Sequence, residues 1–227
     1  MANIIIFLRF VQSMNTILIF SGVYDDERWT VPGARVIDLK SLEGTCCYCD
    51  PDAARSIAEA MADAPLHGLH WIDTGDYHYV TRLWMDRIRE PFALALFDNH
   101  PDDTEPAFGG LLSCGSWVLE ARRSLPMMKA DRLNTSCIPD GLPVYLSIDL
   151  DVLSTQFART DWSQGDWSLD RLFSEMDAIA AGHRILGADI CGGLTSAKGG
   201  TDADYEVNRR TRDAILAYFR SHPLLAG

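Results

Sequence analysis

The feature that most constrains the fold is a repeated alternation between short Val/Ile/Leu-rich runs and longer segments with helical periodicity. The apolar runs predict strands at residues 16–21, 34–40, 68–75, 92–98, 143–153 and 184–193. Apolar side chains recurring on one face predict helices near residues 51–61, 79–88, 116–123, 169–179 and 202–220. Strand followed by helix, repeated along a chain, is typical of parallel strands joined by crossover helices. Because the strands are apolar throughout, we expect helices on both faces, that is an α/β fold with three α/β/α layers and a mostly parallel central sheet.

The size and charge of the chain limit its organisation and its partners. Its 227 residues are 47% hydrophobic, which suffices for one core, so we predict a single domain over residues 1–227, with residues 1–13 as a leader ahead of Met14. The formal net charge of -12 argues against nucleic acid or an anionic membrane as partner. We expect a small-molecule substrate and no membrane span, and leave assembly into a homo-oligomer open.

The six cysteines show no pair of matched CxxC motifs and no disulfide framework. This usage favours free thiols and therefore a cytoplasmic location. Three of them, Cys46, Cys47 and Cys49, crowd into one short segment. Ordinary thiols are the more common outcome for such a segment, and a metal or redox site is the alternative.

Acidic and histidine side chains gather where the predicted strands end. In open parallel sheets, ligands bind just beyond the carboxyl ends of the strands. Four predicted strands bring such residues there, namely Asp73, Asp76 and His78, then Asp98, His100 and Asp102, then Asp149 and Asp151, and finally Asp189. Each motif alone has an ordinary explanation as a turn or a helix cap, but their joint position favours a shared site.

The spacing of these residues suggests a metal centre. Residues two apart in an extended chain point to the same side, so Asp98, His100 and Asp102 converge, as do Asp149 and Asp151. Several carboxylates at one point repel each other unless a cation neutralises them. Carboxylates with one or two imidazoles suit Mn²⁺ or Mg²⁺, with Zn²⁺, Fe²⁺ or Ni²⁺ as alternatives. Two such ions about 3.5–4 Å apart would activate a water molecule as a nucleophile.

The motifs that carry these residues resemble those of the arginase/agmatinase (ureohydrolase) superfamily. The DxHxD motif of that family matches residues 98–102, its SxDxD motif matches residues 147–151, and its GGDH segment corresponds to TGDYHY at residues 74–79. The resemblance implies a binuclear Mn²⁺ centre in an α/β/α fold and hydrolysis of a linear amidine C–N bond. Its implied metal ligands are His78, Asp98, His100, Asp102, Asp149 and Asp151.

The chain also departs from the family pattern. Gly192 stands where the family carries a Glu that holds the guanidinium, and no histidine lies between Gly109 and Glu120, where a proton-shuttling histidine is expected. TGDYHY has an extra residue before His78, and Ser154 follows the SxDxD motif where the family has Asp-Pro. Arginine is therefore not the expected substrate, and a different amidine, amide or acyl compound is.

Other residues near the predicted centre have two possible roles. We predict catalytic roles for Asp102 and Asp189, and substrate contacts for Ser113, Cys114 and Trp162. The alternatives are that Cys114 is a small buried residue, that Asp189 orders a loop and that Trp162 covers the edge of the core. Two further functions stay open, namely a deacetylase-like amidohydrolase with a single zinc and a non-catalytic protein that binds metal.

Overall fold

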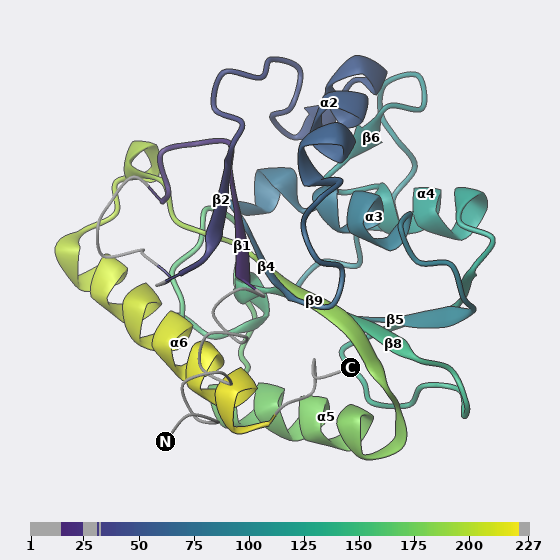
Figure 1. The fold of residues 1–227 in the computed structure, drawn as a ribbon. Coiled ribbons are helices and arrows are strands. Elements are labelled where there is room, and N and C mark those ends of the chain that lie inside the picture. The colour runs from purple at the N-terminus through teal and green to yellow at the C-terminus, as the bar shows by residue number, and fades with distance from the viewer. Residues whose placement is uncertain (1–14, 25–30, 32, 223–227) are drawn as a thin grey trace.

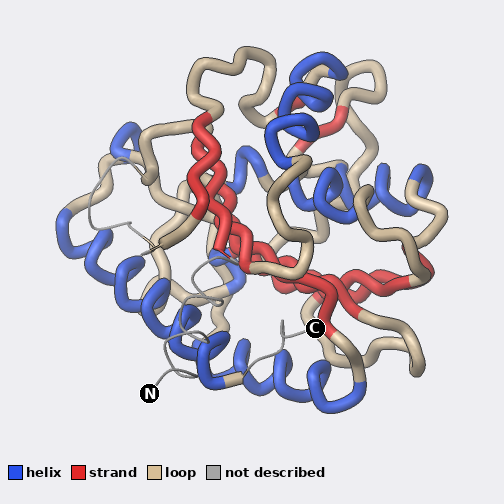
Figure 2. The backbone as a smooth tube through the Cα atoms, viewed as in Figure 1, coloured by secondary structure: helices blue, strands red, loops and turns tan. Residues whose placement is uncertain are grey.

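A seven-stranded sheet runs through the centre of the protein, in the order β2-β1-β4-β9-β8-β5-β7 (Figures 1 and 2). The computed structural model describes residues 15–24, 31 and 33–222. Every neighbouring pair in this sheet is parallel. The strands are β1 (Asn15–Ile19), β2 (Arg35–Asp38), β4 (Leu69–Ile72), β5 (Phe92–Phe97), β7 (Met128–Leu133), β8 (Val144–Asp149) and β9 (Ile185–Cys191). The last strand along the chain, β9, lies between β4 and β8 and joins the two halves of the sheet.

Helices cover both faces of the sheet (Figure 1). One face packs against α2 (Pro51–Met61), α3 (Val80–Met85) and α4 (Trp117–Ser124), and the other against α5 (Leu169–Gly182) and α6 (Asp202–Ser221). The prediction of three layers with a mostly parallel sheet is confirmed.

Strand β5 shows why the central strands are apolar throughout. Ala93, Ala95 and Phe97 join the core under α5 and α6. Their neighbours Phe92, Leu94 and Leu96 join the core under α2, α3 and α4. All six side chains are buried, because successive residues of a strand point to opposite faces and both faces are covered.

Side-chain caps fix where the helices begin. Asp50 Oδ1 accepts hydrogen bonds from the backbone N–H groups of Asp52 (2.9 Å) and Ala53 (2.8 Å) at the start of α2. Ser168 Oγ accepts from Arg171 N (3.1 Å) at the start of α5. Each of these caps stabilises its helix by about 1 kcal/mol.

Some strands differ from the prediction. The first strand was predicted at residues 16–21, but β1 ends at Ile19, because the N–H groups of Phe20 and Ser21 donate to Asp73 Oδ2 (2.8 Å each) instead of to a neighbouring strand. The edge strand β7 was not predicted, since its sequence MKADRL is largely polar and half-buried. The short pair β3 (Tyr48–Cys49) and β6 (Leu112–Ser113) was also not predicted.

Two further predictions concern the ends of the chain and membranes. The predicted leader at residues 1–13 lies outside the described residues. Within the described part of the chain, no helix has the length and apolar character needed to cross a membrane.

Candidate metal centre

The predicted ligands lie together at the carboxyl edge of the central strands. Asp98 directly follows β5, and Asp149 is the last residue of β8. His78 follows β4 through a short 3₁₀ turn, η2 (Gly75–Tyr77). Because β4, β9, β8 and β5 are adjacent and parallel, their carboxyl ends open onto one site, as the sequence predicts.

A first group of ligand-type atoms surrounds His78 Nδ1. This nitrogen lies 3.1 Å from Asp102 Oδ2, 3.2 Å from Asp98 Oδ2 and 3.5 Å from Asp149 Oδ2. All four side chains are buried. Nevertheless His78 Nδ1 and Asp98 Oδ2 make no hydrogen bond with acceptable geometry. Buried polar atoms without a partner are rare, and these two face each other as ligands of a common cation would.

A second group adjoins the first and shares Asp98. His100 Nδ1 lies 2.8 Å from Asp151 Oδ2 and 3.5 Å from Asp98 Oδ1. The two oxygens of Asp98 therefore face two different imidazoles, one in each group. The ligand-type atoms of His78, Asp98 and Asp102 lie within 4.8 Å of one another, and so do those of Asp98, His100 and Asp151. The donor set, four carboxylates and two imidazoles in two adjoining groups that share Asp98, fits two divalent cations.

Hydrogen bonds from neighbouring groups orient most of these carboxylates. Trp117 Nε1, at the start of α4, donates to Asp102 Oδ2 (2.7 Å). Asn99 N donates to Asp151 Oδ1 (3.0 Å), and Asp151 N donates to Asp149 Oδ1 (2.9 Å). Such outer partners hold ligands in place and tune their affinity for a metal.

Asp189 acts on the site through Ser147. Ser147 Oγ donates to Asp189 Oδ1 (2.7 Å) and also lies 2.9 Å from His78 Nε2. Since the Ser147 hydroxyl donates its hydrogen bond to Asp189, its oxygen can accept a hydrogen bond from Nε2–H of His78. That arrangement leaves the lone pair of His78 Nδ1 free to bind a cation.

The pKa values of the cluster show its need for positive charge. Burial and the neighbouring Asp98 raise the pKa of Asp149 to about 7, and burial and Asp149 raise that of Asp151 to about 9. The Asp98 and Asp151 carboxylates raise the pKa of His100 to about 9. Burial opposes a charge on His78, but the carboxylates of Asp102 and Asp98 outweigh it and raise its pKa. Without a cation the cluster therefore holds protons at neutral pH, and a bound cation would replace them.

A pocket of about 180 Å³ opens above the cluster. The six predicted ligands form its floor. The other lining residues are small or apolar, apart from one threonine, and comprise Gly75, Pro101, Thr104, Cys114, Gly115 and Trp162. The indole of Trp162 is 41% exposed and is held by a hydrogen bond from Nε1 to Asp76 Oδ1 (3.0 Å). A Cβ at Gly75 would lie 2.7 Å from Trp162 Cδ1, so the indole reaches this position only because residue 75 is glycine.

Three predicted site residues have different surroundings. Cys114 lines the pocket, and burial raises the pKa of its thiol to about 11, so it is a neutral thiol at physiological pH. Ser113 does not line the pocket, and its hydroxyl is paired with that of Ser116 (2.7 Å). Asp189 lies in the interior of β9 rather than at its end and does not line the pocket either. The catalytic role predicted for Asp189 and the substrate contact predicted for Ser113 therefore stay predictions for residues outside the lining of this pocket.

Gly192 explains one departure from the family pattern. Its φ is +100°, and a Cβ built on it would lie 2.3 Å from Asp149 Oδ1. Any side chain there would collide with a predicted metal ligand. The chain therefore has no room for the Glu that the resemblance places at this position.

Sequence reasoning missed two residues that orient the site. Ser147 was recognised only as part of a motif, without a role. Trp117 looked like an ordinary apolar helix residue, and nothing in its local pattern marks its bond to Asp102.

Comparison with known proteins finds a sequence relative, while no family model matches the chain. An uncharacterized protein of Thermotoga maritima is 32% identical over 196 residues, and the match covers 78% of each chain.

Solved structures share the fold. Arginase from Medicago truncatula superposes with a TM-score of 0.59 at 12% identity, covering 97% of this chain and 95% of the arginase. Formimidoylglutamase from Bacillus subtilis gives 0.62 at 11% identity, with 92% and 86% covered. Trypanosoma cruzi formiminoglutamase with Mn²⁺ gives 0.60 at 9% identity, with 92% and 94% covered. At these identities the likeness establishes the fold, and it confirms the predicted arginase-like architecture.

Proposed function

We propose that this chain is a metal-dependent hydrolase of linear, non-peptide C–N bonds. The chain belongs to the same family as the Thermotoga maritima protein and has the arginase/ureohydrolase fold. The observation that carries the proposal is the pair of adjoining ligand groups that share Asp98 at the floor of the pocket. Two groups favour a binuclear centre over the single-zinc alternative, which needs only one.

We propose Mn²⁺ as the native metal, held by His78, Asp98, His100, Asp102, Asp149 and Asp151. The unpartnered His78 Nδ1 and Asp98 Oδ2 support this assignment. So does the Mn²⁺ named for the Trypanosoma cruzi protein of the same fold. When bound, two such cations would supply Lewis-acid polarisation of the substrate and an activated water molecule.

The residues of the chain then have separate tasks. Asp102 lies at the pocket floor, held by Trp117 Nε1, where its carboxylate can take a proton from the attacking water and pass it to the leaving amine. Asp189 sets the proton position of His78 through Ser147, which makes it a positioning residue rather than a catalytic one. Trp162 and Pro101 give the pocket part of its apolar lining.

The pocket supports a substrate other than arginine. All four carboxylates that line it belong to the proposed ligand set, so none remains to pair with a guanidinium group. With about 180 Å³ of space, the pocket suits a small substrate. We propose a small amidine of the formimino or guanidino type that is held in the pocket without a separate carboxylate partner and is hydrolysed to an amide or urea and a free amine. The free state of all six thiols supports a cytoplasmic setting for this reaction.

Metal analysis and a substrate screen test the proposal. Protein purified without chelators should contain about two Mn per chain, or take up that number from added Mn²⁺. A panel of guanidino, formimino and acetylated amines should then yield urea, formamide or amine from one of the first two classes. One zinc per chain with acetate release would indicate the deacetylase-like alternative, and metal uptake without turnover would indicate a non-catalytic binder. Failure to bind any divalent ion would contradict all three.

A further inference from the structure

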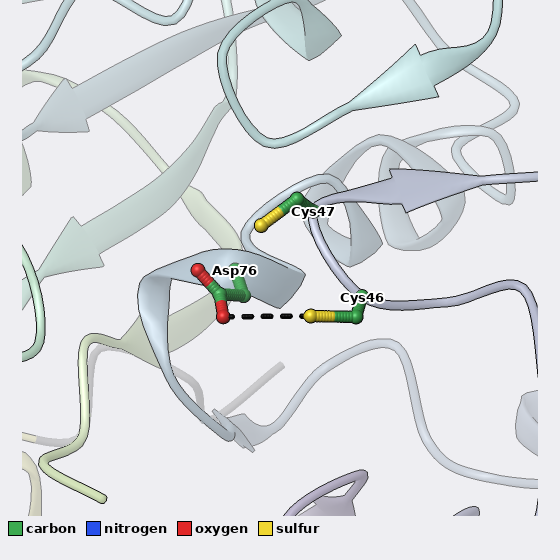
Figure 3. A group of neighbouring side chains, drawn as sticks. All are labelled: Cys46, Cys47 and Asp76. Carbon is green, nitrogen blue, oxygen red and sulfur yellow. Dashed lines mark hydrogen bonds between the residues drawn. The ribbon is translucent and has the colours of Figure 1, made fainter. Parts of the chain in front are cut away.

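A second group of metal-binding side chains lies beside the pocket and outside the set described above. Figure 3 shows Cys46 and Cys47, from the loop that leads into β3, with their sulfurs beside the carboxylate of Asp76 on η2. Cys46 Sγ lies 3.7 Å from Asp76 Oδ2, and one ligand atom from each of the three residues lies within 4.8 Å of the others. A tetrahedral zinc ion with bonds of about 2.3 Å needs sulfurs about 3.8 Å apart, so only small movements separate this arrangement from a zinc site.

The protein holds these groups in place from several directions. Tyr79 Oη donates to the carbonyl of Thr45 (2.7 Å), and Cys114 N donates to the carbonyl of Cys47 (2.9 Å). The other oxygen of Asp76 accepts from Trp162 Nε1 (3.0 Å). The two cysteines and the carboxylate are therefore set by the scaffold before any ion binds.

The side chains of this group are of the types that bind a divalent cation. Two thiols and a carboxylate are ligands for a thiophilic divalent ion rather than for Mg²⁺ or Ca²⁺. Among the described residues, Asp76 accepts hydrogen bonds from two neutral donors, the Trp162 indole and the Cys46 thiol.

We propose that Cys46, Cys47 and Asp76 form a separate site for one thiophilic divalent ion, Zn²⁺ or an ion of similar chemistry. On binding, each of the two thiols loses a proton to the solvent, so the ion is held by two thiolates and one carboxylate, with a fourth position for water. The site borders the catalytic pocket without sharing a ligand with it. Because Asp76 also holds Trp162, occupation of the site fixes the indole that forms one wall of the pocket.

A Cd²⁺ titration of the full chain tests the site. The chelator-treated protein, kept reduced with a non-thiol reductant, should develop thiolate-to-cadmium absorption that saturates at one ion per chain. Zn²⁺ should compete it away. Cys46→Ser and Cys47→Ser should each weaken binding by more than about tenfold, since even loss of an outer-shell partner costs 10–100-fold. Asp76→Asn should weaken binding while leaving both thiols present.

Two controls separate this site from the centre at the pocket floor. Cys137→Ser removes an exposed thiol elsewhere and should leave the absorption unchanged. His100→Ala should lower Mn²⁺ content but keep the cadmium absorption, so that failure of one site is distinguishable from failure of the other. No thiolate absorption in the native protein would overturn the proposal, as would equal absorption in a folded Cys46→Ser, Cys47→Ser double variant, with folding checked by circular dichroism.

Discussion

Asp98 joins the two halves of the candidate centre, because each of its oxygens faces a different histidine. A change at Asp98 would disturb both groups, whereas a change at His100 would disturb one. His100 is also the more exposed of the two histidines, with a third of its side chain accessible. It is therefore the better residue for testing the assignment without disturbing the core.

We expect His100→Ala to lower Mn content from about two ions per chain to one or fewer and to abolish hydrolysis, because the second group loses its only nitrogen ligand. Elemental analysis by mass spectrometry measures this directly. The matched control is His67→Ala, which removes an exposed imidazole and should leave metal content unchanged. Unaltered Mn stoichiometry in His100→Ala would count against the assignment.

His70 makes stability depend on pH for a reason unrelated to metal. It is buried in β4, where its ring nitrogens contact Tyr145 Oη (3.1 Å) and the carbonyl of Pro65 (2.9 Å). Burial lowers the pKa of His70 to about 3. The unfolded chain takes up the proton first, near pH 6.5, so the stability due to neutral His70 is present above that pH and is lost as the pH falls toward 3.

We therefore expect His70→Gln to flatten the acid side of the stability profile. Between pH 6 and pH 4, the free energy of unfolding of the native protein should fall by ~1.4 kcal/mol per pH unit more than that of the variant. Urea denaturation at several pH values, with chelator present in both samples, isolates this difference. Parallel profiles for the two proteins would refute the buried-histidine explanation.

Residue spacing predicted that the candidate ligands share one edge of the sheet but not how they divide between the two groups. Asp149 and Asp151 were expected to converge as alternate residues of an extended strand. In the structure β8 ends at Asp149, and Asp151 lies in the 3₁₀ turn η3 (Leu150–Val152). The turn brings Asp151 to His100, while Asp149 faces His78. Local backbone geometry at a strand end depends on bonds such as Asp151 N to Asp149 Oδ1, which spacing alone cannot reveal.

At the scale of elements, the end of β9 limits what the site can contain. Gly192 follows β9 with φ +100° and leaves no room for a Cβ beside Asp149. Gly199 has a similar φ of +79°, but nothing lies within 4 Å of a Cβ built on it. A side chain at position 199 would therefore meet backbone strain alone, whereas a side chain at position 192 would also collide with Asp149.

We expect Gly192→Ala to lower Mn²⁺ affinity by about tenfold or more and to destabilise the protein by roughly 2 kcal/mol or more, because the new methyl group displaces Asp149. Gly199→Ala should cost only the ~1–2 kcal/mol of left-handed strain and leave the affinity unchanged. Isothermal titration with Mn²⁺ and thermal melting measure the two effects. Equal Mn²⁺ affinity in the two variants would show that the contact with Asp149 does not matter.

The buried central strands could be predicted, whereas the edge strand β7 and the short pair β3–β6 could not. β5 and β8 are buried on both faces, so their sequences reveal them. β7 lies at the edge of the sheet, where half-exposed positions accept Lys, Asp and Arg, and its sequence carries no strand signal. The β3–β6 pair has two residues per strand and depends on contacts between segments more than 60 residues apart along the chain, which local patterns do not record.

At the scale of the whole molecule, the cluster of buried charges couples metal binding to stability. A ligand that binds the folded chain alone stabilises it by about 2.7 kcal/mol at 100 times its Kd. The six predicted ligands come from three separate segments, around residues 78, 98–102 and 149–151, so the unfolded chain presents no comparable site.

We expect saturating Mn²⁺ to raise the Tm of the chelator-treated protein by about 5–10 °C, in proportion to that stabilisation for a chain of this size. Differential scanning calorimetry gives the shift. The same addition to Asp98→Asn should produce a much smaller change, since both ligand groups lose a shared charge. An unchanged Tm after addition of Mn²⁺ to the native protein would mean that the cluster does not bind the ion.

The position of β9 has a consequence for synthesis on the ribosome. This strand is the last of the sheet to be made, yet it alone connects β4, which leads to His78, with β8, which carries Asp149. A nascent chain that stops short of residue 191 has two unconnected half-sheets, so His78, which follows β4, is not yet joined to the ligands that follow β5 and β8. The proposed metal centre would therefore be completed late in synthesis, after β9 has joined the two half-sheets.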